Sequence, residues 1–137
     1  MSSLTAYQAL RTWFEANWLT TPRFFENEAV PLFDTPAPFV YFETRGDVFA
    51  QRSIGSAENK WREEGTANFF VCVPTGDGVQ LAQGYASALV ELLRGLLLPA
   101  TDLRCRQISV GISGPFRDNG NYYALPLVTW WQRDTLS

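Results

Sequence analysis

Two turn-like segments carry residue types that could bind a phosphate or a cation. Gly76-Asp77-Gly78 joins an apolar segment to a helical one, the position at which a glycine-rich loop can hold a phosphate. The third glycine of G-x-G-x-x-G would fall at Leu81 and no G-K-[ST] follows, so an ordinary strand-to-helix turn is the better interpretation. Asp118-Asn119-Gly120-Asn121 has oxygen ligands but lacks the remaining ligands and the glutamate of a calcium loop. A hairpin turn accounts for it.

The acidic and nucleophilic residues do not form a catalytic set. Glu63 and Glu64 are adjacent, and neighbours on a strand point to opposite faces, so these carboxylates do not converge on one substrate atom. Ser109 and Ser113 do not form G-x-S-x-G. The chain has no histidine, which excludes Ser-His and Cys-His pairs. We therefore expect no catalytic residue, no metal and no cofactor, and a protein that is not an enzyme.

Composition indicates one globular domain over residues 1–137. The net charge is −3, whereas proteins that hold nucleic acid through its phosphates normally carry a basic surplus. Cys72 and Cys105 show no metal-binding spacing, and Met1–Thr5 does not resemble a signal peptide, so a reduced pair is expected. The apolar runs are far shorter than the ~20 residues of a membrane helix, so we expect a soluble protein without a membrane partner.

Hydrophobic periodicity predicts two helices. Leu4–Trp18 has apolar residues at three- and four-residue spacing. In Val79–Leu93 the polar residues occupy an arc of only ~80° at 100° per residue. Such a helix either has two sides covered inside its own domain or has one side covered by a partner chain.

Alternating apolar and polar residues predict strands. The segments are Phe39–Thr44, Lys60–Val73, Asp102–Ser113 and Asn121–Arg133. The order helix, strand, strand, helix, strand, strand predicts an α+β domain. Its sheet is expected to be mainly antiparallel, four-stranded or slightly larger, with both helices packed on one face.

The connections are expected to be irregular. Thr21–Pro38 contains four prolines and is predicted to be an extended connection. Gly46–Asn59 is polar with weak periodicity and is predicted to be a long loop or a loosely paired hairpin tip. Pro126 lacks a backbone donor, so its strand is expected to lie at a sheet edge or to be bulged there.

The predicted loop Gly46–Asn59 is a candidate partner-contact segment. Phe49 and Ile54 are large apolar residues in an otherwise polar stretch, with the charged Asp47 and Arg52 beside them. Connections longer than ~12 residues within compact domains are usually functional or disordered. The alternative is an ordinary flexible hairpin tip.

Three arginines form a second candidate surface. Arg104 and Arg106 share one strand face by alternation, and Arg62 lies on a strand that could be a neighbour. Arginine binds carboxylates in a bidentate manner better than lysine does. This set could mark a contact between subunits or a channel lining that faces DNA; ordinary surface salt bridges are the alternative.

Several segments, taken in order along the chain, resemble a known family. After the first helix come Phe25-Glu26-Asn27-Glu28-Ala29-Val30-Pro31 and Pro38-Phe39-Val40-Tyr41-Phe42. Four further segments complete the set. They are Arg62-Glu63-Glu64-Gly65, Phe69-Phe70-Val71, Val73-Pro74-x-Gly76-x-Gly78 and a last strand ending in Trp130-Trp131-Gln132-Arg133. Together they are similar to the tail terminator family (tail completion, minor tail protein U-like) of long-tailed bacteriophages and phage-like gene transfer agents.

The resemblance implies a structural assembly protein of the virion tail, put together in the bacterial cytoplasm. It implies a homohexameric ring that caps the tail tube, ends polymerisation of the tube protein and presents a joining surface to the head–tail connector or stopper protein. DNA would pass through the ring without sequence-specific binding. Alternatives are another head–tail connector or tail tube component, or a small α+β dimer that binds an apolar metabolite.

Overall fold

The computed structural model describes residues 4–26, 37–55, 59–76, 78–98, 102–111, 114–116 and 119–136. In this part of the chain, two helices and seven strands follow the order α1 (Leu4–Asn17), β1 (Arg23–Phe25), β2 (Phe39–Gln51), β3 (Lys60–Pro74), α2 (Val79–Leu93), β4 (Leu97–Leu98), β5 (Leu103–Val110), β6 (Gly114–Phe116) and β7 (Asn119–Leu136). Both helices have the predicted positions to within a residue. Neither of these helices is long and apolar enough to cross a membrane.

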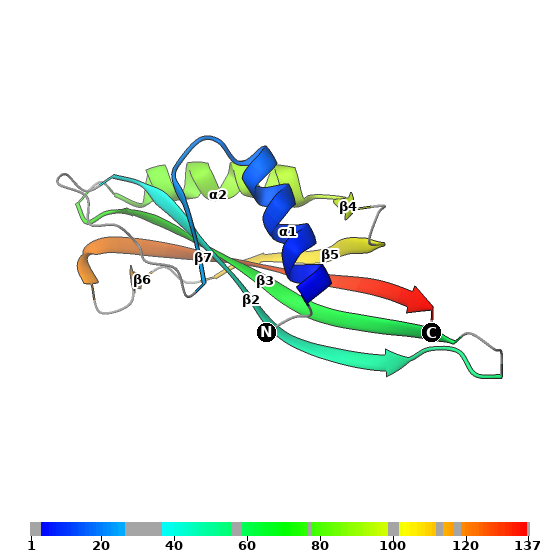
Figure 1. Ribbon diagram of the computed structural model, residues 1–137. Coiled ribbons are helices and arrows are strands. Elements are labelled where there is room, and N and C mark those ends of the chain that lie inside the picture. The colour runs from blue at the N-terminus through cyan, green and yellow to red at the C-terminus, as the bar shows by residue number, and fades with distance from the viewer. Residues whose placement is uncertain are drawn as a thin grey trace.

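The sheet is larger and more curled than the sequence predicts (Figure 1). Its order is β1-β2-β3-β7-β5-β4, with β6 also paired to β7. Among the described strands, β1 and β2 form the one parallel pair. The predicted fold, a mainly antiparallel sheet of four or slightly more strands in the order helix, strand, strand, helix, strand, strand, is therefore wrong. The sheet is seven-stranded, mixed and strongly curled. The missed strands β1, β4 and β6 have two or three residues each, too few to show an alternation.

Strand β7 lies in the middle of the sheet, so of the two positions expected for Pro126, a sheet edge or a bulge, the edge is wrong. Pro126 is paired with Phe70 of β3 on one side. On its other side, β5 ends at Val110 and β6 begins at Gly114. The Gly111 N–H donates to the Pro126 carbonyl oxygen at 2.8 Å, so the missing donor of the proline coincides with a gap between two partner strands.

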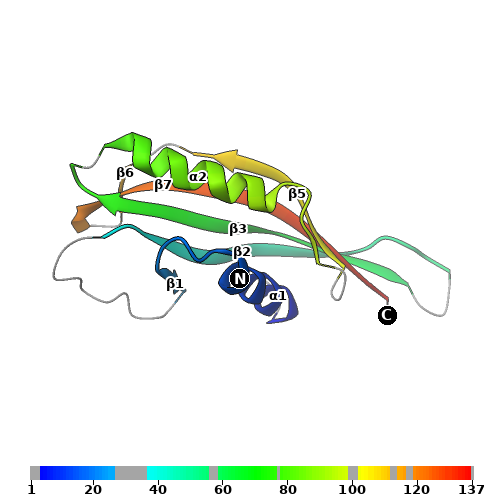
Figure 2. The same ribbon diagram turned by 90° about the horizontal axis from the view of Figure 1, so that it is seen from above.

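Strand β2 extends much further than predicted. Residues 47–51, expected in a long loop or a loosely paired hairpin tip, pair with β3 as far as Gln51 opposite Trp61. A register shift between Arg45 and Asp47 breaks the two-residue alternation, which hides the strand in the sequence. The result is a long β2–β3 hairpin whose end projects beyond both helices (Figures 1 and 2).

The two helices pack on one face of the sheet and form the main core with it (Figure 2). Phe14 of α1 is fully buried, and its ring lies 5.0 Å from Phe69 and 5.8 Å from Phe42, centroid to centroid. A smaller apolar cluster occupies the other face, around Phe39 and Tyr122, whose rings are 4.9 Å apart. Burial on both faces explains why the second half of β3 is apolar throughout.

Replacing Phe14 by alanine tests this packing. We expect Phe14→Ala to lower the free energy of unfolding by about 3–5 kcal/mol, because it leaves a cavity among aromatic rings. Leu4→Ala, an exposed position on the same helix, should change it by less than about 0.5 kcal/mol. Urea titration measures both, and equal effects would contradict the packing.

Candidate interaction surfaces

The end of the β2–β3 hairpin exposes large apolar side chains. Val48, Phe49 and Ile54 are 63%, 51% and 92% exposed. The Arg52 N–H donates to the Lys60 carbonyl oxygen at 2.7 Å, which continues the pairing of β2 with β3 one residue past Gln51. We call residues 48–54 the hairpin tip. Of the predicted contact residues, the tip contains Phe49, Arg52 and Ile54, while Asp47 pairs with Gly65 through its backbone and its side chain lies outside the description.

Basic residues gather on the sheet face that points away from the helices. Arg52 and Arg106 lie 3.7 Å and 3.9 Å from the same Glu64 carboxylate, although Arg52 follows β2, Arg106 lies on β5, and β3 and β7 separate these two strands. Arg62 lies 2.9 Å from the Asp134 carboxylate. We call this surface the arginine face; it consists of Arg52, Lys60, Arg62, Arg104 and Arg106.

The three arginines selected from the sequence do share this face. Arg62 and Arg104 lie in register with Asp134 and Gln132, two residues apart on β7. Arg104 pairs with Asp102 at 3.2 Å, so its guanidinium contacts a neighbour on its own edge. Each arginine thus makes an ion pair, as the salt-bridge alternative expects. The face nevertheless holds more cations than carboxylates, on a chain whose net charge is −3.

The neighbouring carboxylate of Glu63 faces the helices instead. It is almost fully buried and lies 3.2 Å from Arg133. Glu63 and Glu64 therefore point to opposite faces, as their adjacency on a strand predicts.

The remaining residues considered for chemistry form no site in the described part of the chain. Gly76 and Gly78 have φ values of 101° and 83°, and Gly78 caps α2 without a side-chain hydrogen bond. Asp77 of the strand-to-helix turn and Asp118 of the expected hairpin turn lie outside the described residues. Among the described side chains, no group of three His, Cys, Asp or Glu could hold a metal ion.

Both cysteines are free thiols. Cys72 is buried in the smaller apolar cluster. Burial raises the pKa of the Cys105 thiol, so that this group remains protonated at neutral pH.

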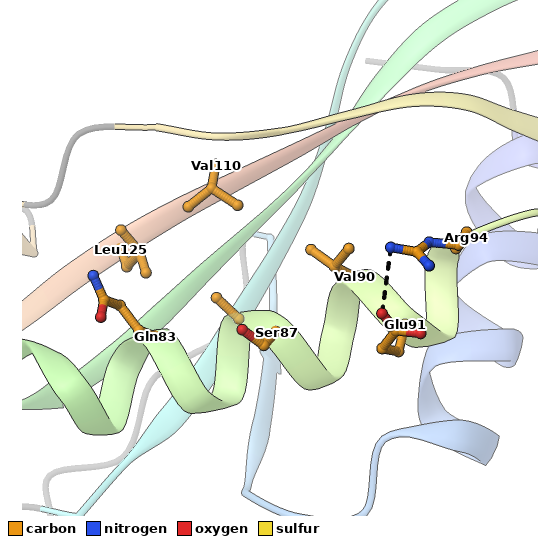
Figure 3. A pocket seen from close by; sticks show the side chains of 8 residues that line it. Gln83, Ser87, Val90, Glu91, Arg94, Val110 and Leu125 are labelled. Carbon is orange, nitrogen blue, oxygen red and sulfur yellow. Dashed lines mark ion pairs between the residues drawn. The ribbon is translucent and has the colours of Figure 1, made fainter.

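An open groove runs between α2 and the β5 side of the sheet (Figure 3). Its volume is about 430 Å³. Val110 and Leu125 face Gln83, Ser87 and Val90 across it, and an Arg94–Glu91 ion pair of 3.4 Å lies at one end.

Helix α2 also leaves part of its apolar surface uncovered. Leu81 and Leu92 are each 37% exposed. The sequence left open whether the domain itself covers two sides of this helix. The described residues cover one side of α2 and leave Leu81 and Leu92 partly exposed, so an apolar strip of the helix is available to a partner.

Comparison with known proteins informs on the fold alone. No family model matches the chain, and no curated protein matches it. Solved structures do match. One of them, whose name states no function, is 19% identical, with a TM-score of 0.53 over 93% of this chain and 89% of its own. At this identity the likeness shows a shared fold.

The Arg62–Asp134 contact makes stability depend on pH. The hydrogen bond from Arg62, with Lys60 beside it, holds the pKa of Asp134 below its ordinary value of 3.8, against the opposite effect of burial. A lowered pKa in the folded state stabilises the protein above pH 3.8, and that contribution is lost as pH falls through the folded value. Asp134→Asn should therefore be less stable than the parent at pH 7, with the difference vanishing in acid.

Denaturant titrations at pH 7 and pH 2 measure this difference. Asp102→Asn is the matched control, because its ion pair with Arg104 is exposed and should contribute at most about 1 kcal/mol. A deficit of Asp134→Asn that is equal at both pH values would rule out the assigned contact.

Proposed function

We propose that this chain is a tail-terminator-like assembly subunit, which forms a homohexameric ring at the end of a phage-type tail tube. The single observation that carries the proposal is the hairpin tip, which lies beyond both helices (Figure 1) and exposes large apolar side chains. Exposed apolar residues at the end of a long hairpin are typical of a contact with another protein. The family resemblance supplies the kind of assembly.

The proposed partners are other copies of this chain, the tail tube protein and the head–tail connector or stopper protein. The proposed location is the tail of a virion or phage-like particle, assembled in the bacterial cytoplasm. In such a ring the arginine face supports the passage of DNA. Its cations are partly neutralised by Glu64 and Asp134, which suits a weak, sequence-independent contact with phosphates.

Electron microscopy of intact particles tests the proposal directly. A tag at the end of β7 should be found between the tail tube and the head connector, in a ring with six-fold symmetry. Particles in which the chain occupies another position, or a ring with another symmetry, would overturn it.

A charged substitution at the tip tests the contact. Ile54→Asp should fold normally, because this side chain is 92% exposed, and should prevent tail completion. Leu19→Asp is the control, since Leu19 is 75% exposed but lies after α1. Thermal unfolding checks the fold, and tail length and head joining are scored by microscopy. Normal tails with Ile54→Asp would show that the tip is an ordinary hairpin end.

A further inference from the structure

Two stretches of backbone lie unpaired at opposite edges of the described sheet. On β2, strand β1 pairs only with Val40–Phe42, which leaves residues 47–51 with β3 alone. On β5, strand β4 pairs only with Leu103 and Arg104, which leaves residues 107–110 with β7 alone. Both stretches follow a register shift and are regular from there on.

The hydrogen bonds at the ends of these stretches show which backbone groups face outward. The Gly111 N–H bonds to Pro126 of β7, so by two-residue alternation the N–H and C=O of Ile108 and Val110 point away from β7. The Arg52 N–H bonds to Lys60 of β3, so those of Phe49 and Gln51 point away from β3. Each edge therefore presents donors and acceptors at the spacing that an added antiparallel strand requires.

The direction of the strands makes the two edges compatible. Three antiparallel pairings separate β2 from β5, so these strands run in opposite directions. Phe49 lies at the level of Arg133 of β7 and Val110 at the level of Leu127, six residues or about 20 Å apart along the strands. The two stretches therefore meet in a closed ring only when the strands are tilted relative to the ring axis, as in closed barrels. Rotation of a copy about such an axis preserves the strand directions. Strand β5 of one copy and strand β2 of the next then meet antiparallel, in the head-to-tail arrangement from which closed rings are built.

Side chains at the two edges also match. Phe49 is in register with Glu63 and Val110 with Leu127, so both point to the helix side of the sheet. Both are exposed, and Val110 lines the groove beside α2. With Val110 opposite Phe49 of the neighbour, the phenyl ring would lie at the groove and face Val90 and Leu125 (Figure 3).

We propose that β5 of one copy pairs antiparallel with β2 of the next copy, with Phe49 of the second copy in the α2 groove of the first. The sheet then continues from subunit to subunit. This inference rests on the proposed function only in taking a ring of identical copies; it concerns how they join.

Disulfide cross-linking tests the pairing and its register. With Val110 opposite Phe49, Ala50 lies opposite Ser109 on the arginine-face side, at a close pair suited to a disulfide. Within one chain these residues are three strand spacings (about 14 Å) apart across the sheet and six residues (about 20 Å) apart along it, which no disulfide spans. Oxidation of the double variant Ala50→Cys/Ser109→Cys should give a ladder of covalent oligomers, both for the purified chain at high concentration and in particles.

Single variants are the controls. Ala50→Cys and Ser109→Cys should each remain monomeric on oxidation, and an equal mixture should give dimers only. Cross-linking of Ser109→Cys to itself would mean that β5 edges pair with one another and would overturn the proposal. Absence of the ladder in both preparations would also overturn it.

The groove contact has its own test. Phe49→Asp should abolish the ladder when added to the double variant, whereas Val48→Asp, on the opposite face of the same strand, should retain it. Thermal unfolding confirms that both fold. If the Phe49→Asp and Val48→Asp variants gave the same yield of covalent oligomers, Phe49 would not belong to the interface. If the ladder forms but the chain is not found in tails, the proposed function is wrong and the edge pairing is supported. If the chain forms rings in tails but gives no ladder, the edge pairing is wrong and the proposed function is supported.

Discussion

The pairing of β3 with β7 is the constraint on which the rest of the structure depends. It runs over fifteen residue pairs, from Lys60 opposite Leu136 to Pro74 opposite Tyr122. Because successive side chains alternate between faces, a shift by one residue would exchange the two faces along the whole length. The present register places Phe69 under the helices. It also directs Glu63 to Arg133 inside and leaves Glu64 for Arg52 and Arg106 outside. Both the core and the arginine face follow from this one ladder.

The strands are much longer than the helices that cover them, and this difference in length explains why the end of the hairpin is exposed. Helices α1 and α2 have 14 and 15 residues, which at 1.5 Å per residue is about 22 Å. Strand β3 has 15 residues, which at about 3.3 Å per residue is about 50 Å. Two helices on one face cannot cover strands more than twice their length unless they are placed end to end, and α1 and α2 are not (Figure 2). Uncovered sheet at one end is therefore a geometric consequence of the element lengths, and the residues there determine whether it meets water or a partner.

Sequence reasoning located the long elements α1, α2, β3, β5 and β7, each of which carries a hydrophobic pattern over eight or more residues. The extension of β2 escaped because the bulge after Arg45 shifts the alternation at the point where a strand signal would continue. The edge position expected for Pro126 was wrong because a missing backbone donor does not require an edge of the whole sheet. It requires only a place where no partner strand needs that donor, and Pro126 lies where β5 has ended and β6 has not begun. The shared face of Arg62, Arg104 and Arg106 was predictable from alternation. The meeting of Arg52 and Arg106 at Glu64 was not, because it depends on β7 lying between their strands.

The two faces at the hairpin end differ in what they tolerate on assembly. Arg52, Arg62 and Arg106 are partly solvated, and removing such ion pairs from water costs more than their mutual attraction returns unless the geometry is ideal. A face of this kind suits a water-filled channel. Phe49 and Val110, on the other face, lose only unfavourable contact with water when they are covered. Under the proposed assembly, the dry contacts therefore belong on the helix side and the channel on the arginine face, and the alternation of side chains along β2 and β5 separates the two within a single strand pair.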